Sequence, residues 1–86
     1  MAYAQVTVTT SPTLIVPPNN ARRQLIVENQ SASAAVYIGP NPSISTSSTV
    51  RLVAGATLEI DGQWFLSALY GVVGSGTATV GYWEHP

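Results

Sequence analysis

The sequence predicts an all-β protein: a small antiparallel β-sandwich (jelly-roll-like) or barrel of about seven or eight short strands. Apolar residues recur with a period of two, and turn-forming residues interrupt them at short intervals. No stretch of about ten residues combines helical periodicity with capping residues. At 86 residues the chain has room for one hydrophobic core, so positions 1–86 are expected to form a single β domain.

The expected strands follow one another along the chain. Val6 and Val8 alternate with threonine within residues 1–10, a segment expected as a first strand or as an N-terminal arm that adds a strand to a neighbour. Later runs repeat the alternation, with apolar pairs at Leu25 and Val27, Val36 and Ile38, Val50 and Leu52, Leu58 and Ile60, and Val80 and Tyr82.

Other segments indicate how the strands are connected. Residues 64–70 are apolar on both faces, as expected of a buried central strand. The dipeptide Asp61-Gly62 predicts a hairpin turn between two strands. Residues 40–49 are rich in proline, serine and threonine, which favours an exposed loop, or a loop with an edge strand that pairs only with a partner.

Charge is scarce throughout the chain. Only 8% of residues are charged, lysine is absent, and the net charge is −1. This composition excludes a broad basic surface for nucleic acid or an anionic membrane. With no cysteine for a disulfide and a core of marginal size, the chain is expected to gain stability by packing against copies of itself or another protein.

Residues for catalysis or metal binding are few. The single histidine, His85, lies next to the C-terminal residue, where chain ends fray. Glu59 and Asp61 share one face of a strand, a spacing more typical of a solvated face than of a catalytic pair or a weak cation site. The glycine-rich residues 71–77 lack the following helix of a phosphate-binding loop. We therefore expect no enzymatic activity, no small-molecule substrate, no metal and no cofactor.

A few residues are candidates for an interface with another subunit or with a larger assembly. Arg22 and Arg23 are expected on opposite sides of a solvated strand start, or in an intersubunit salt bridge. Tyr82 and Trp83 also occupy opposite faces, so one is expected to be exposed, either as a protein–protein contact or as a platform for a sugar ring. No cluster of Asp, Asn and Arg surrounds them in the sequence. The full candidate set is Tyr3, Val6, Val8, Arg22, Arg23, Tyr82 and Trp83.

The order of strand and turn residues resembles that of short proteins encoded beside the capsid genes of tailed bacteriophages. The segments that carry the resemblance are RRQLIVENQS at 22–31, VYIG at 36–39, GATLE at 55–59, ALYG at 68–71 and GTATV at 76–80. The resemblance implies a virion structural role, in particular that of a capsid decoration (cement) protein, which commonly forms a β-sandwich trimer over a local symmetry axis of the head. It assigns no contact residues.

These observations together predict a homo-oligomer, with a trimer favoured, that bridges subunits of the major capsid protein and stabilises the head. The alternatives are a tail, neck or fibre-base component of the virion, and a carbohydrate-binding β-sandwich module. The N-terminal residues lack the basic and apolar regions of a signal peptide, and no apolar run is long enough to span a membrane. The expected location is the capsid exterior, after assembly in the host cytoplasm.

Overall fold

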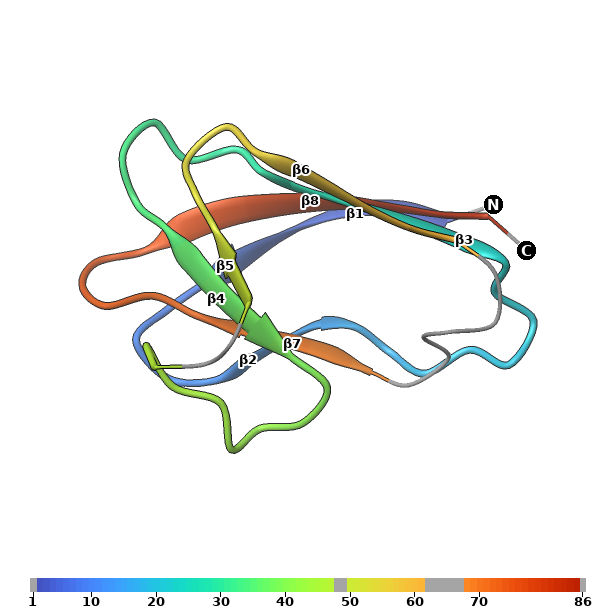
Figure 1. Ribbon diagram of the computed structural model, residues 1–86, viewed down its shortest axis with the longest axis horizontal. Coiled ribbons are helices and arrows are strands. Elements are labelled where there is room, and N and C mark those ends of the chain that lie inside the picture. The colour runs from blue at the N-terminus through green and yellow to red at the C-terminus, as the bar shows by residue number, and fades with distance from the viewer. Residues whose placement is uncertain (1, 48–49, 62–67, 86) are drawn as a thin grey trace.

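The computed structural model describes residues 2–47, 50–61 and 68–85, and every regular element among them is a β-strand. Figure 1 shows these strands arranged in two layers. The eight described strands confirm the predicted all-β class and strand number. They are β1 (Ala2–Val8), β2 (Thr13–Val16), β3 (Gln24–Asn29), β4 (Val36–Gly39), β5 (Val50–Leu52), β6 (Thr57–Asp61), β7 (Leu69–Val72) and β8 (Ala78–His85).

The strands form two four-stranded sheets. The first sheet has the order β1-β8-β3-β6, the second has the order β2-β7-β4-β5, and all neighbours are antiparallel. Consecutive strands lie in different sheets except β4 and β5, which pair directly. Eight strands wound between two sheets in this order make a jelly-roll sandwich, as the sequence predicts, and not a closed barrel.

The N-terminal segment is the first strand of this sandwich. β1 pairs with β8 in an unbroken register from Ala2 opposite Glu84 to Val8 opposite Ala78. Residues 2–8 therefore form a first strand of the chain's own sheet, one of the two expectations for residues 1–10. The pairing with β8 satisfies backbone groups along one edge of β1, and Val8 enters the core of its own chain with 0% exposure. Val8 is accordingly not an interface residue.

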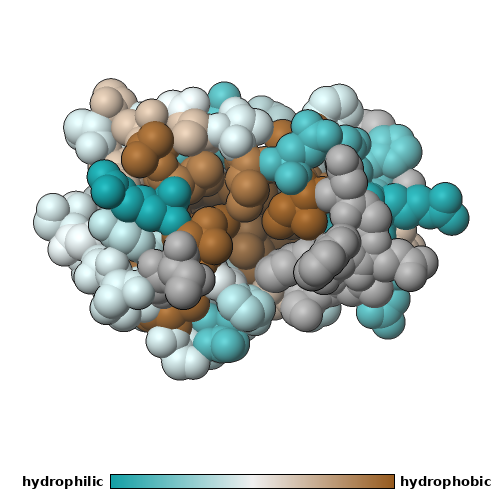
Figure 2. Space-filling view, viewed as in Figure 1, coloured by the Kyte–Doolittle hydropathy of each residue, from teal (hydrophilic) through white to brown (hydrophobic). Residues whose placement is uncertain are grey.

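The core lies between the sheets and consists of the inward positions of the alternating strands. Figure 2 shows apolar residues gathered between the two layers, with more polar residues around them. The buried cluster comprises Val8, Ile15, Val16, Leu25, Val27, Val36, Ile38, Leu52, Leu69, Val73, Ala78 and Val80. Gly71 on β7 leaves room for this packing, because a Cβ there would lie 2.7 Å from Ile15 Cδ1.

Four local features of the chain can be compared with the expectations. β2, between two proline-containing segments, was not predicted. The hairpin predicted at Asp61-Gly62 lies outside the described residues from Gly62 on; β6 before it pairs with β3 in the first sheet, and the next described strand, β7, lies in the second. Of residues 64–70, only 68–70 are described, and β7 is an interior strand as predicted. The described residues 40–47 form a loop, exposed except at a half-buried Ile44.

Candidate functional site

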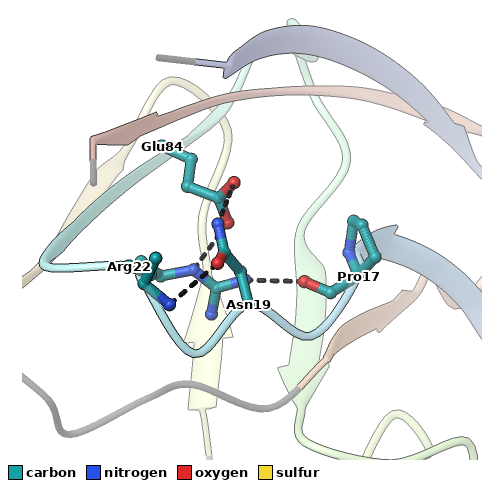
Figure 3. A network of polar contacts seen from close by, with 5 residues as sticks. Pro17, Asn19, Arg22 and Glu84 are labelled. Atoms are coloured by element: carbon teal, nitrogen blue, oxygen red, sulfur yellow. Dashed lines mark hydrogen bonds and ion pairs between the residues drawn. The ribbon is translucent and has the colours of Figure 1, made fainter.

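Arg22 forms a buried ion pair within its own chain. The Arg22 side chain is 2% exposed, and its Nε donates to Glu84 Oε2 at 2.7 Å (Figure 3). Both expectations for Arg22, a solvated strand start and an intersubunit salt bridge, are therefore wrong. The partner carboxylate belongs to β8, 62 residues along the chain, so local sequence gave no sign of the pair.

Other polar groups complete the surroundings of this ion pair. Asn19 Nδ2 donates to the second carboxylate oxygen of Glu84 at 3.0 Å, and Arg22 Nη2 donates to the carbonyl oxygen of Pro17 at 2.7 Å (Figure 3). The network fastens the connection between β2 and β3 to β8. Because its charges face one another inside the domain, its role is structural.

The remaining candidate residues divide between the two faces of the first sheet. Arg23, just before β3, is exposed, whereas the neighbouring Arg22 is buried. Tyr82 is half-buried and packs against the core, while Trp83 on the opposite face is 44% exposed. Val6 is half-buried on the inner side of β1. The expectation that one of Tyr82 and Trp83 is exposed is therefore confirmed.

Tyr3, Trp83 and Ile26 form an apolar row across the outer face of the first sheet. Trp83 lies opposite Tyr3 on β1 and opposite Ile26 on β3, so the three are neighbours on adjacent strands. Tyr3 is 70% exposed, and Ile26 is half-buried. Side chains opposite one another on adjacent antiparallel strands lie within contact distance. The row thus offers two adjoining aromatic side chains to a partner.

A shallow groove of about 190 Å³ adjoins this apolar row. It is lined by Tyr3, Ile26, Glu28, Gln30, Thr57, Gly81, Tyr82 and Trp83. Gly81 contributes no side chain in the middle of the face, and the Gln30 side chain occupies the space above it. A Cβ at position 81 would lie 2.7 Å from Gln30 Nε2, so glycine at this position allows Gln30 to cross the sheet.

Amide and carboxylate groups border the groove in a hydrogen-bonded chain. Gln5 Nε2 donates to Gln30 Oε1 at 2.7 Å, and Gln30 Nε2 donates to Glu28 Oε1 at 3.2 Å. These polar groups come from β1, from β3 and from the residue after β3. The sequence analysis missed them because they meet only through the pairing of both strands with β8. They place hydrogen-bonding groups beside the aromatic pair, where the sequence showed no polar cluster.

The described part of the chain offers no other chemical centre. Within residues 2–47, 50–61 and 68–85, no group of three or more His, Cys, Asp or Glu side chains could hold a metal ion. No helix among these residues is long and apolar enough to cross a membrane. No family model, curated protein or solved structure matches the chain. The outer face of the first sheet is thus the feature on which a functional proposal rests.

Proposed function

We propose that this chain is a virion structural protein, a capsid decoration protein that stabilises a phage head by bridging subunits of the major capsid protein. The observation that carries the proposal is the apolar row of Tyr3, Trp83 and Ile26, exposed on the outer face of a domain with few charges. The resemblance of residues 22–84 to small proteins encoded beside phage capsid genes supports it. The jelly roll occurs in viral capsid domains, although a fold alone assigns no function.

The apolar row can supply the binding energy for such a contact. Burial of a large apolar side chain contributes roughly 1.5–3 kcal/mol, and Tyr3 and Trp83 are 70% and 44% exposed in the free domain. Aromatic residues are among the side chains most often responsible for tight protein–protein contacts. The row itself is uncharged, so burying Tyr3, Trp83 and Ile26 requires no ionised group of the row to lose water.

In the proposed role, the protein stabilises the shell because it binds assembled capsid subunits in preference to free ones. A protein that binds only the intact shell stabilises it by about 2.7 kcal/mol per site when present at a hundredfold excess over Kd. A homo-oligomer places several copies of the face on neighbouring capsid subunits. Linking several copies raises the overall affinity even when each contact is unchanged, because the second and later copies bind at a high effective concentration.

The apolar row is tested by replacing both aromatic residues. Tyr3→Ser with Trp83→Ser is expected to weaken co-sedimentation with purified heads of the phage that encodes the chain by at least about tenfold, because two central apolar contacts are lost. Leu14→Ser is the matched control, since Leu14 lies on the second sheet and is 43% exposed, close to the 44% of Trp83. It is expected to leave binding unchanged.

Failure of the unmodified protein to bind heads would refute the proposed function, and equal binding by the double variant would refute the role given to the apolar row. Electron microscopy of intact particles separates the head from other locations. Density for the protein on the tail, neck or fibre base would favour that alternative virion role over decoration of the head.

A second candidate function is a carbohydrate-binding module, which the polar chain of Gln5, Gln30 and Glu28 favours. Aromatic faces stack on sugar rings, and neighbouring amides and carboxylates hydrogen-bond to hydroxyl groups. On an array of immobilised oligosaccharides, Trp83→Ala is expected to reduce any binding by at least about tenfold, and Leu14→Ala to leave it unchanged. An array without hits for the unmodified protein would remove this candidate.

A further inference from the structure

The edge strands of the two sheets differ in how well they are protected from pairing with another chain. Natural proteins protect exposed edges with short strands, bulges, prolines or charged side chains. In the second sheet, β2 has four residues and an irregular register, and β5 has three residues with exposed Arg51 at its centre. In the first sheet, β6 presents exposed Glu59. Each of these three edges therefore has at least one protective feature.

β1 lacks all of these features. It has seven residues, an unbroken register with β8, and neither a charged residue nor a proline. Within the described residues, no strand pairs with its outer edge. A long, regular and uncharged edge strand is a ready template for adding another strand.

The pairing inside the first sheet fixes which β1 backbone groups face this free edge. The Gln30 N–H donates to the Thr79 carbonyl at 2.9 Å, so Thr79 and every second residue after it direct their backbone groups toward β3. The other residues of β8 direct their backbone groups toward β1. These are Ala78, Val80, Tyr82 and Glu84, which pair with Val8, Val6, Ala4 and Ala2, respectively. The backbone N–H and C=O groups that point outward from β1 therefore belong to Tyr3, Gln5 and Thr7.

We propose that β1 is the contact through which two copies of this chain pair, antiparallel, about a two-fold axis at Gln5. The two four-stranded first sheets would then form one continuous sheet across the axis. The outward groups of Tyr3, Gln5 and Thr7 match one another in this register, giving about six hydrogen bonds from three N–H donors in each copy.

The side chains of β1 suit a second copy in this register. Tyr3 would face Thr7 of the other copy, and Ala4 would face Val6, so each larger side chain meets a smaller one. Gln5 would face its own counterpart, a neutral pair able to donate and accept hydrogen bonds. Across a two-fold axis any charge meets its like, so the absence of charge from β1 favours this partner. Self-pairing of β6 would instead bring two copies of Glu59 onto one narrow strip of sheet.

This inference does not depend on the proposed capsid role, since it concerns only how copies of the chain associate. Light scattering coupled to size-exclusion chromatography tests it without any phage head. The unmodified protein is expected to show twice the 9.0 kDa mass of one chain. A two-fold contact yields pairs, so a trimer alone would not result from it.

A charge-swap pair gives the sharper test. Gln5→Lys and Gln5→Glu are each expected to raise the Kd for self-association at least about tenfold, because two like charges meet at the axis. An equimolar mixture of the two variants is expected to restore association, since the lysine of one copy then meets the glutamate of the other. Only a residue that faces its own counterpart gives this rescue.

Thr79→Lys is the matched control, because it adds the same charge to the exposed face of β8, one strand inward from the edge. It is expected to leave association unchanged, and circular dichroism checks that every variant is folded. The proposal is overturned if the unmodified protein is monomeric at roughly 100 µM, or if it forms only trimers. It is equally overturned if mixing fails to restore association, or if Thr79→Lys disrupts it as strongly as Gln5→Lys.

Discussion

Glu84→Ala is expected to lower the free energy of unfolding by about 3–5 kcal/mol, the cost typical of removing one partner from a buried ion pair. The substitution leaves the guanidinium of Arg22, which is 2% exposed, without the carboxylate it contacts at 2.7 Å. It also removes the acceptor of the Asn19 side-chain amide. Since small domains have about 5–15 kcal/mol of stability in total, this single change would remove a large fraction of it.

Urea unfolding followed by circular dichroism measures this loss. Arg23→Ala is the matched control: Arg23 adjoins Arg22 in the sequence but is exposed, so its removal is expected to change stability by no more than about 0.5 kcal/mol. Arg22→Met combined with Glu84→Leu is expected to recover part of the loss, because no unpaired charge remains. A loss below about 1 kcal/mol for Glu84→Ala would contradict the structural role given to the ion pair.

Asn29→Ala is expected to lower the free energy of unfolding by about 2–4 kcal/mol, because it leaves buried backbone groups without hydrogen-bond partners. Asn29 lies on β3 with 0% exposure. Its Nδ2 donates to the carbonyl oxygens of Ala34 and Leu52, both at 2.8 Å, and its Oδ1 accepts from the Ser31 N–H at 3.0 Å. One side chain thus connects the first sheet to β5 of the second.

Asn29→Asp keeps the shape of the side chain and tests the direction of these bonds. A carboxylate cannot donate to the two carbonyl groups, so we expect at least as large a loss as for Asn29→Ala. Asn41→Ala is the control, since this exposed loop residue makes only local hydrogen bonds to Ser43 and is expected to cost about 0.5 kcal/mol or less. Equal losses at the two asparagines, measured by the same unfolding experiment, would contradict the bridging role.

Alternation along the chain was sufficient to predict most strands and their buried faces. Leu25 and Val27 are both fully buried, and Glu28 beside them is exposed, as a period of two requires. β2 was not predicted because Leu14, Ile15 and Val16 are consecutive apolar residues and show no alternation. A short apolar run between prolines was the available signal, and length alone does not separate such a run from a buried loop.

Pairing between distant strands was what the sequence did not specify. β6 and β7 follow one another among the described strands, yet they lie in different sheets, and no local pattern in the sequence indicates this. The ion pair of Arg22 could not be predicted either, because its partner Glu84 is 62 residues away. The exposed aromatics at Tyr3 and Trp83 were candidates from sequence, whereas the bordering Gln5 and Gln30 required knowledge of how β1 and β3 each pair with β8.

The position of β8 also bears on the order of folding. β8 is the last described strand along the chain, but it lies between β1 and β3 in the first sheet. β1 therefore has no partner in that sheet until β8 is present, and their contact closes a loop of nearly the whole chain. Folds dominated by such distant pairings fold slowly, in milliseconds to seconds. During synthesis on the ribosome, the first sheet can be completed only after residues 78–85 have left the exit tunnel.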